Sequence, residues 1–439
     1  MDFSHIQLQR TMSKAPAKKR TINKPLRADE PDDKQKLREY EFTRSDSYRR
    51  AVESHISLLG KDDTSYFTLS EAIRLWGETE SDDGRVATVP PFYLGGELPF
   101  EHDPPRFPAI ENPKFKFIDL FAGVGGFRMA LQQLGGECVF SSEWDSAAQE
   151  TYYRNYGEYP FGDITLESTK KHVPRSFDVL CAGFPCQAFS IAGKRGGFED
   201  TRGTLFFDVA EIIRSRQPKA VFLENVKGLR NHDGGKTLAT ILNVLREDLG
   251  YFVPDPEIVN ARDFGVPQNR ERIYIVAFHP STGVSKFSYP RPLPKRKVFA
   301  DVKEKDTVDA KYYLSTQYLK TLEEHRRRHE SKGNGFGYEV IPDDGIANAI
   351  VVGGMGRERN LVLDDRLTDF TPTTRIKGEV NRKGIRRMTP REWARLQGFP
   401  DRFLIAKSDA QAYKQFGNSV AVPAIKATAR QILSALNIE

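Results

Sequence analysis

FIDLFAGVGGF, residues Phe117–Phe127, joins a strand-like apolar run to a glycine-rich turn and the start of a helix. An acidic residue followed by closely spaced glycines at such a junction lets backbone amides approach a nucleotide-like ligand. The glycine spacing lacks the pyrophosphate fingerprint of dinucleotide-binding folds, and aromatic residues flank the turn. The turn therefore predicts a cofactor without phosphates, with S-adenosylmethionine as the first candidate and a purely structural turn as the alternative.

Strand-like runs alternate with helical patterns from this turn to about residue 280. The strands are expected at Phe115–Phe121, Cys138–Glu143, Asp178–Gly183, Ala220–Glu224 and Ile273–Phe278, with helices such as Leu205–Arg216 and Leu238–Leu249 between them. Such alternation predicts an α/β fold with a doubly wound, mostly parallel sheet. Helical periodicity returns at Pro390–Leu396 and Ala421–Leu436, so the last helix is expected to pack on the first domain.

Changes in composition divide the chain into five parts. Gln9–Arg27 carries seven basic and no acidic residues, which indicates a disordered arm, and helical spacing follows in Lys34–Leu59 and Thr68–Trp76. Proline and glycine mark a linker at Pro90–Pro113 and irregular chain after Pro280. We therefore expect a basic arm (1–33), a helical extension with linker (34–112), a catalytic and cofactor-binding domain (113–281), a smaller domain (282–410) and a returning C-terminal segment (411–439).

Composition limits the class of protein only broadly. The 439 residues carry a net charge of +6, which permits binding to a polyanion, and no apolar run approaches the roughly 18 to 20 residues that span a bilayer. Three cysteines are too few for a disulfide framework. We expect a cytoplasmic chain without a membrane partner or a metal site, in which any important cysteine acts as a thiol.

Several residues stand where parallel strands end and ligands usually bind. Glu143 ends the second strand, where its carboxylate can accept hydrogen bonds from ribose hydroxyls, and Trp144 offers an aromatic face to an adenine. GFPCQAFSIAGKR places Cys186 on a loop with Lys194 and Arg195, which can lower the pKa of its thiol. The alternative for each cysteine is a small buried residue, and this is the expectation for Cys138 and Cys181.

Two further motifs bring charge to the same edge of the sheet. ENV (Glu224–Val226) ends the next strand with a carboxylate that can protonate or hydrogen-bond a substrate base. QNRERIYIV (Gln268–Val276) supplies Arg270 and Arg272, alternate residues suited to a carboxylate, a base carbonyl or a phosphate.

At these residues the chain resembles the bacterial DNA cytosine-5 methyltransferases of restriction-modification systems. The resemblance runs from Phe115 to the C-terminus and rests on motifs in family order: FIDLFAGVGG, GDI, GFPCQAFS, RGTLF, ENV, QNRERIY, RRMTPREWARLQGFP and QFGNSV. The N-terminal hundred residues fall outside it. It implies a Rossmann-like methyltransferase domain with a smaller target-recognition domain, in which residues 332–385 would read the DNA.

The resemblance also implies roles for individual residues. The residues that would handle a flipped cytosine are Cys186, as covalent nucleophile, Glu224, Arg270 and Arg272. Those that would line the S-adenosylmethionine pocket are Phe121, Gly123, Glu143, Trp144, Asp163, Ile164, Leu205, Asn418 and Ser419. The implied partner is double-stranded DNA, together with a cognate restriction endonuclease acting on the same site, and the chain is expected to be a monomer.

Other functions remain as alternatives. A transfer-RNA cytosine-5 methyltransferase would share the chemistry at the base, and a non-catalytic DNA-binding regulator would share the fold. A nicotinamide-dependent oxidoreductase is disfavoured by the glycine spacing. An amino-group methyltransferase would need two prolines and an aromatic residue after an acidic or amide residue, and GFPCQ differs from that pattern.

Overall fold

The computed structural model describes residues 104–185, 205–333, 337–353 and 357–438, together with eleven separate residues between 35 and 54. Cys186, Lys194 and Arg195, as well as the arm at 1–33 and the helix expected at Thr68–Trp76, lie outside the described residues.

A six-stranded sheet forms the centre of the larger region, in the order β2-β1-β3-β4-β7-β5. Its strands are β1 (Phe115–Leu120), β2 (Gly136–Ser142), β3 (Val179–Ala182), β4 (Ala220–Val226), β5 (Glu257–Asn260) and β7 (Glu271–Phe278). The first four strands pair in parallel, whereas β7 is antiparallel to both β4 and β5. The expected α/β class and mostly parallel sheet are therefore confirmed.

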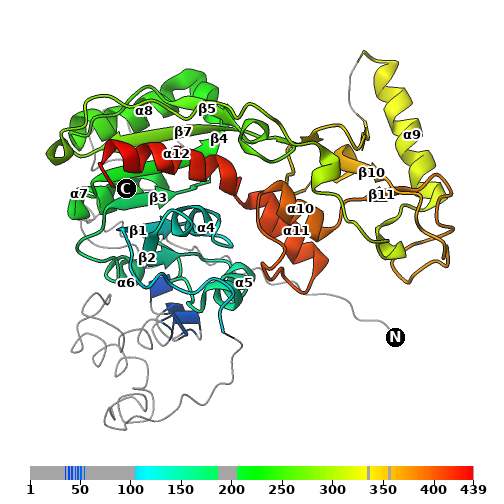
Figure 1. The fold of residues 1–439 in the computed structure, drawn as a ribbon, viewed down its shortest axis with the longest axis horizontal. Coiled ribbons are helices and arrows are strands. Elements are labelled where there is room, and N and C mark those ends of the chain that lie inside the picture. The colour runs from blue at the N-terminus through cyan, green and yellow to red at the C-terminus, as the bar shows by residue number, and fades with distance from the viewer. Residues whose placement is uncertain are drawn as a thin grey trace, which may run out of the picture.

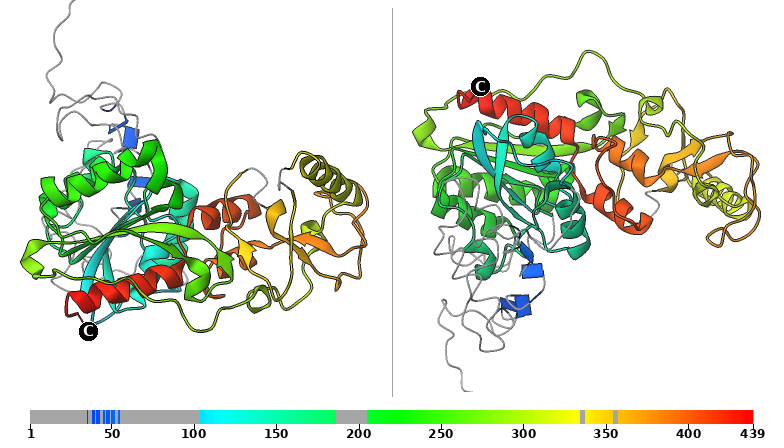
Figure 2. Two further views of the ribbon diagram at one scale, coloured as in Figure 1. Left: turned by 90° about the horizontal axis from the view of Figure 1, so that it is seen from above. Right: turned by 60° about the horizontal axis from the view of Figure 1, so that its bottom comes forward.

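Helices cover both faces of this sheet, as Figure 2 shows. On one face lie α4 (Gly126–Gln132), α5 (Ser146–Tyr156) and α12 (Val422–Ala435). On the other face lie α6 (Glu167–Lys170), α7 (Leu205–Arg216) and α8 (Lys236–Asn243). The short π-helix η4 (Val244–Asp248) continues α8. Alternate strand residues enter two separate cores: Phe117 packs into one, and Ile118 and Leu120 into the other. A strand buried on both faces reads as a continuous apolar run, which is why these strands were visible in the sequence.

The smaller region lies beyond the end of this sheet (Figure 1) and contains short elements. They are α9 (Thr316–Glu330), β8 (Val340–Ile341), β9 (Ala347–Asn348), β10 (Leu361–Leu363), β11 (Ile385–Arg387), α10 (Pro390–Leu396) and α11 (Asp409–Asn418). In the described residues the 3-10 helices are η3 (Lys227–Gly235), η5 (Ala261–Phe264), η6 (Pro280–Thr282), η7 (Phe299–Asp301), η8 (Ala310–Tyr312) and η9 (Glu358–Asn360).

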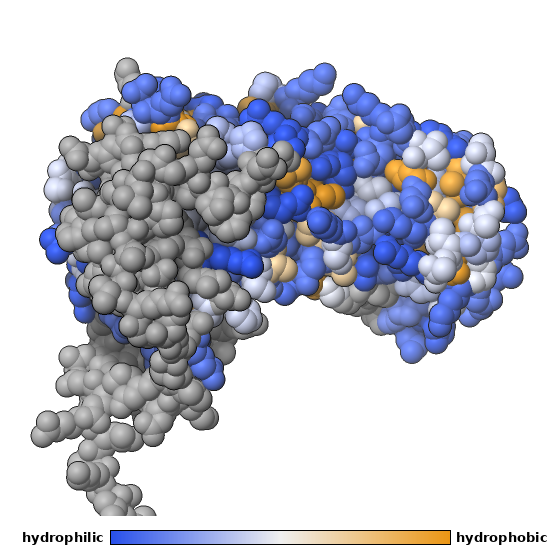
Figure 3. Space-filling model, turned by 90° about the horizontal axis from the view of Figure 1, so that it is seen from below, coloured by the Kyte–Doolittle hydropathy of each residue, from blue (hydrophilic) through white to orange (hydrophobic). Residues whose placement is uncertain are grey.

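The two regions are joined by a short pair of strands and share an apolar core. Strand β6 (Gln268–Asn269), which precedes β7, pairs in parallel with β9 of the smaller region. Trp393 on α10 belongs to the same apolar cluster as Phe117, and α12 packs against α4. The described face in Figure 3 is mostly hydrophilic, with apolar side chains in small separate groups.

The stretch read as a linker packs more closely than its composition suggests. Phe107 is buried, its amide donates to the Asn155 carbonyl at 2.8 Å, and the Arg402 guanidinium lies 4.6 Å from the centre of its ring. A single aromatic side chain therefore fixes the end of a proline-rich segment on the core, an effect that composition does not reveal.

Candidate active site

The glycine-rich turn between β1 and α4 forms an open cradle. Phe121, Gly123 and Gly125 all have left-handed backbone angles, with φ of 57°, 56° and 82°. This conformation is uncommon for a residue with a side chain, so Phe121 carries local strain. A Cβ at Gly123 would meet nothing within 4 Å, whereas one at Gly125 would collide with the Tyr156 ring at 2.5 Å. Space therefore opens on one side of the turn, beside Gly123.

Glu143 ties the end of β2 to this turn. Its Oε2 accepts from the Gly123 amide at 2.8 Å and its Oε1 from the Asp145 amide, also at 2.8 Å. The carboxyl group is buried, and desolvation raises its pKa. Trp144, the next residue, is 77% exposed. A nearly buried acceptor thus stands beside an exposed aromatic ring.

Asp119 lies in β1 just before the turn and forms a hydrogen bond with the helix that follows it. It is fully buried in β1, its Oδ2 accepts from the Arg128 amide at 3.2 Å, and burial raises its pKa to about 7. Arg128 itself forms a buried bidentate ion pair with Glu158, at 2.7 and 2.8 Å. These contacts fix α4 against β1 and against the loop that follows α5.

The other predicted cofactor residues differ in position and in exposure. The loop after α5 runs back beside the end of β2, where the Glu143 amide donates to the Phe161 carbonyl at 2.8 Å. Asp163 follows two residues later, so it lies near the same end of β2. Ser419 Oγ lies 3.0 Å from the position of a Cβ on Gly126. Ile164 is 2% exposed, Leu205 is partly buried at the start of α7, and Asn418 is exposed at the end of α11.

Glu224 and Arg272 form the second half of the site, at the end of β4. Arg272 Nε lies 3.1 Å from Glu224 Oε1, and both side chains are mostly buried. A Cβ on Gly183 would lie 3.7 Å from Glu224 Oε2, so this carboxylate lies beside the first residue of the GFPCQ loop. The structure thus brings together two of the four predicted catalytic residues, next to the loop that leads to Cys186.

Asn225 is a site residue that the sequence reading did not single out. Its side-chain amide donates to the Phe184 carbonyl at 2.9 Å, two residues before Cys186, and its Oδ1 accepts from the Val226 amide at 2.8 Å. Asn225 is almost fully buried. It therefore fixes the base of the loop that leads to Cys186, and its place in the ENV motif was the only signal in the sequence.

Arg270 binds the backbone at the junction between the two regions. Its terminal nitrogens donate to the carbonyls of Ile350 at 2.9 Å, Gly417 at 3.3 Å and Ser419 at 2.7 Å. Burial lowers its pKa to about 9, the nearby Arg272 adds to this, and Glu224 opposes it. This position differs from that of Arg272, because main-chain carbonyls already occupy the two terminal nitrogens.

Two buried glutamines extend the same junction. Gln268 accepts from the Ile350 amide at 3.0 Å and donates to the Leu396 carbonyl at 2.8 Å, while Gln397 donates to the Phe416 carbonyl at 2.7 Å. Both are fully buried. Their places in the QNRERIY and RRMTPREWARLQGFP motifs were the only signal in the sequence, since contacts to main-chain atoms leave no paired residue type.

The two described cysteines are poorly suited to nucleophilic chemistry. Cys138 and Cys181 are buried, and burial raises the pKa of the Cys138 thiol to about 12 and that of Cys181 well above its usual range. A thiol held neutral is a weak nucleophile. Their expected structural role agrees with this environment.

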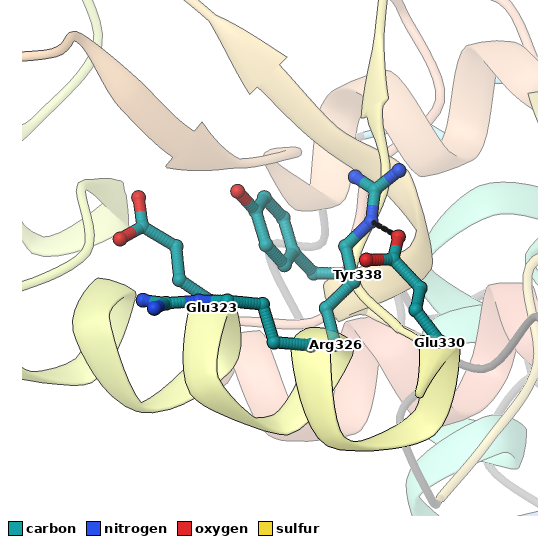
Figure 4. A pocket seen from close by; sticks show the side chains of 5 residues that line it. Glu323, Arg326, Glu330 and Tyr338 are labelled. Carbon is teal, nitrogen blue, oxygen red and sulfur yellow. Dashed lines mark hydrogen bonds and ion pairs between the residues drawn. The ribbon is translucent and has the colours of Figure 1, made fainter. Parts of the chain in front are cut away.

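A groove of about 220 Å³ lies on α9 and is lined by Glu323, Arg326, Arg327, Glu330 and Tyr338. Figure 4 shows the Tyr338 ring standing over the helix between Glu323 and the Arg326–Glu330 pair. Arg326 is paired with Glu330 at 2.8 Å and lies 5.6 Å from the centre of the Tyr338 ring. The groove's lining is thus mostly charged, and Glu323 pairs with Lys383 at 2.8 Å. No helix in the described part of the chain has the length and apolar character needed to cross a membrane.

Comparison with known proteins agrees with this geometry. The chain is 77% identical over 323 residues to the Type II methyltransferase M.HpaII of Haemophilus parainfluenzae, covering 74% of this chain and 90% of that protein. It is 41% identical over 337 residues to the Type II methyltransferase M.HhaI of Haemophilus parahaemolyticus, covering 74% and 96%.

A solved structure and a family model agree with these sequence relatives. The crystal structure of the S. pombe Dnmt2 methyltransferase superposes with a TM-score of 0.54 at 18% identity, covering 74% of this chain and 99% of that one. The fold is therefore that of a Rossmann-like methyltransferase. The model of the C-5 cytosine-specific DNA methylase family matches residues 115–434. The chain thus belongs to the C-5 cytosine-specific DNA methylase family and is a DNA cytosine-5 methyltransferase.

Proposed function

We propose that the chain transfers a methyl group from S-adenosylmethionine to C5 of a flipped cytosine in a specific duplex DNA sequence, through a covalent adduct with Cys186. The observation that carries the proposal is the Glu224–Arg272 pair at 3.1 Å beside Gly183, three residues before Cys186. A carboxylate, a guanidinium and a loop with a thiol at one edge are the groups that addition to a pyrimidine requires.

The cradle fits S-adenosylmethionine in both shape and polarity. The space beside Gly123 admits a ligand, the Glu143 oxygens retain lone pairs for ribose hydroxyls, and the exposed Trp144 ring can stack on an adenine. We assign Phe121, Gly123, Glu143, Trp144, Asp163, Ile164, Leu205, Asn418 and Ser419 to this pocket. When bound, the cofactor supplies an electrophilic methyl group on a sulfonium.

The chain's own residues make C5 reactive. The Cys186 thiolate adds to C6, while Glu224 protonates or hydrogen-bonds N3 and accepts from the exocyclic amine, and Arg272 holds the base carbonyl and orients the carboxylate. C5 then takes the methyl group, and the electrons of the broken sulfur–methyl bond stay on the sulfur as a neutral thioether. The C5 proton passes to water, any proton on N3 returns to Glu224, and cleavage of the C6–sulfur bond releases Cys186 as a thiolate and restores the aromatic ring.

Arg270 takes a supporting role in this proposal. Its guanidinium holds three carbonyls of the junction, including that of Ser419, and its charge lies close to the Glu224–Arg272 pair. We therefore propose that Arg270 handles the flipped cytosine indirectly, by fixing the backbone around the pocket.

The substrate follows from the chemistry at C6. This atom must be approached perpendicular to the ring, so the base must leave the stack. We propose duplex DNA as the substrate, held between the two regions and read by residues 332–385, with Type II relatives supporting a protective role beside a restriction endonuclease of the same site. A cytoplasmic monomer is part of this proposal.

Replacing Cys186 with serine tests the nucleophile. The hydroxyl conserves size but is hardly ionised near neutral pH, so methyl transfer should fall by orders of magnitude, at least about 10³-fold. The wild-type protein should form a covalent adduct with duplex DNA containing 5-fluorocytosine, because fluorine cannot leave as a proton does, and Cys186→Ser should form none. Denaturing gel electrophoresis with labelled DNA measures both.

Cofactor and DNA binding provide the control. Cys186→Ser should retain the wild-type Kd for S-adenosylhomocysteine and for DNA, since the residues of the cradle are untouched. Methylation by Cys186→Ser at a near wild-type rate would refute the assignment. A preference for transfer RNA over duplex DNA in the same assay would favour the alternative substrate.

A further inference from the structure

The described residues between 35 and 54 pack against the loop that carries Asp163 and Ile164. They lie outside the family match, which begins at residue 115. Tyr48 and Ala51 are buried in the same apolar cluster as Phe161 and Ile164. The extension and this side of the proposed cofactor pocket therefore share one core.

Arg38 makes the contact closest to the proposed pocket. Its Nη2 is paired with Asp163 Oδ2 and lies 3.5 Å from Thr165 Oγ1. The other oxygen of Asp163 accepts from the Thr165 amide at 2.9 Å and from its hydroxyl at 2.8 Å. Arg38 and Thr165 thus hold the carboxylate from both sides and fix its orientation. The Asp163 side chain is still 25% exposed, so it remains open to a ligand.

Glu39, the next residue, fixes the following turn. Its Oε1 accepts from the Glu167 amide at 2.5 Å, and its Oε2 accepts from the Ser168 amide at 3.1 Å and from the Ser168 hydroxyl. Gln35 adds a bond from its side-chain amide to the Thr165 carbonyl at 3.2 Å. Consecutive parts of the loop are therefore held by polar side chains of the extension.

Close apolar contacts anchor these polar ones. A Cβ on Gly162 would lie 2.0 Å from the Phe42 ring, so the ring rests directly on the backbone beside Asp163. Tyr48 Oη lies 3.1 Å from His172 Nε2, and the His172 ring stacks on Phe161 at 4.5 Å between centroids. Only a glycine at position 162 accommodates this approach.

A second route reaches the ribose side of the pocket. Ser47 Oγ donates to Gln149 Oε1 at 2.6 Å, and the Gln149 amide donates to the Glu143 carbonyl at 2.6 Å. Both carboxylates of the proposed pocket are therefore supported from the extension, Asp163 directly and Glu143 through its backbone.

We propose that the N-terminal extension is an integral part of the cofactor pocket and that Arg38 is a positioning residue for Asp163. The proposal rests on the assignment of Asp163 to the S-adenosylmethionine pocket. Arg38 holds the carboxylate in one orientation, so that its remaining lone pairs face a donor group of the cofactor, such as the adenine amine. A pocket arranged before binding loses less conformational freedom when the ligand arrives.

The test compares Arg38→Ala with Arg50→Ala in the full chain. Arg50 is a matched control: its side chain is also 53% exposed, and it lies 3.5 Å from Tyr159 Oη and 4.0 Å from Glu150, away from Asp163. Arg38→Ala should raise the Kd for S-adenosylhomocysteine in calorimetry about three- to fivefold, the range of a partly exposed ion pair. Arg50→Ala should leave this Kd unchanged.

Steady-state kinetics separates positioning from general damage. In Arg38→Ala the KM for S-adenosylmethionine should rise while kcat and the KM for DNA stay at wild-type values, and Arg38→Lys should recover much of the loss because it keeps the charge. Equal effects of Arg38→Ala and Arg50→Ala would overturn the proposal, as would tighter cofactor binding in Arg38→Ala, which would mean that Arg38 competes with the cofactor for Asp163.

Asp163→Ala distinguishes failure of this inference from failure of the proposed function. Asp163→Ala should weaken cofactor binding, and adding Arg38→Ala to it should have no further effect, because Arg38 acts through Asp163. If Asp163→Ala weakens binding but Arg38→Ala does not, only the positioning role is wrong. If Asp163→Ala leaves the Kd unchanged, Asp163 does not belong to the pocket and the assignment beneath the inference is wrong.

Discussion

Glu224 is a mostly buried carboxyl group that is paired with a cation in the proposed site. It lies at the end of a buried strand, 3.1 Å from the guanidinium of Arg272 and beside Gly183. A charge that is shielded from water interacts more strongly with its neighbours than a solvated one. The same carboxylate can therefore hold Arg272 in place and bond to a base in the pocket.

Glu224→Gln tests this group with little change in shape. The amide cannot donate a proton as a carboxylic acid does, and it binds Arg272 more weakly than a carboxylate, so the rate of methyl transfer should fall about 10²- to 10⁴-fold. Single-turnover methylation of duplex DNA measures the effect. The Kd for S-adenosylhomocysteine should remain at the wild-type value, and a rate within threefold of wild type would exclude Glu224 from the chemistry.

Charged residues at the ends of strands could be predicted as candidate site residues from the sequence. Residues whose side chains bind main-chain atoms could not. Glu224 and Arg272 carry charge at the ends of recognisable strands, and the structure pairs them. Asn225, Gln268 and Gln397 hold main-chain carbonyls, and only the folded backbone shows which carbonyls need a donor.

The elements show how a charged network organises a short helix. Helix α10 begins with a capping box, in which Thr389 Oγ1 accepts from the Glu392 amide at 3.1 Å and Glu392 Oε2 accepts from the Thr389 amide at 2.8 Å. The Glu392 carboxylate also accepts a hydrogen bond from each terminal nitrogen of Arg386, at 2.8 Å each. Arg386 in turn binds Asp364 at 2.9 Å, and all three charged side chains are fully buried.

Removing the charge of Glu392 should destabilise this part of the molecule strongly. Glu392→Gln leaves the buried Arg386 with one anionic partner instead of two, which should cost about 3 kcal/mol, at the lower end of the range for a broken buried pair. Urea unfolding followed by the fluorescence of Trp393, buried on α10, measures the loss.

A surface pair provides the comparison. Glu330→Gln on α9 removes an exposed partner of Arg326 four residues away, which should cost no more than about 0.5 kcal/mol. Equal losses in Glu330→Gln and Glu392→Gln would show that the buried network contributes no more than a surface ion pair.

Elements with strong periodicity were predictable from the sequence, and short ones were not. The structure has α7 and α10 at the expected bounds, Leu205–Arg216 and Pro390–Leu396. Strand β5 was missed because it has four residues and only one of them is buried. The short strands of the smaller region pair over two or three residues, too few for an alternating pattern to be recognised.

Around Ile350, many of the contacts between the two regions of the molecule use main-chain atoms. Strand β9 pairs with β6, Arg270 binds the Ile350 carbonyl, and Gln268 binds the Ile350 amide. Side chains of the larger region thus form hydrogen bonds with the backbone of the smaller one. The sequence of the smaller region can therefore vary around Ile350 without losing these contacts, whereas Gln268 and Arg270 cannot change freely.

This arrangement allows residues 332–385 to be exchanged as a unit. The segment contains β8, β9 and β10 and ends at Ile385, just before Arg386 and α10. If it reads the DNA, replacing it with the segment of a relative that methylates another site should transfer the donor's site, while methyl transfer persists at a rate within about tenfold of wild type. The donor must carry a carboxylate where this chain has Asp364, because Arg386 would otherwise lose a buried partner.

Bisulfite sequencing of DNA from cells that express each chimera identifies the methylated site directly. The control exchanges α9 (Thr316–Glu330) from the same donor, which should leave the site unchanged if residues 332–385 alone read the bases. The exchanged helix must keep a carboxylate at position 323, because Glu323 pairs with Lys383 at 2.8 Å. A functional chimera of residues 332–385 that still methylates the original site would mean that the bases are read from elsewhere. A change of site in the α9 chimera alone would assign the reading to that helix.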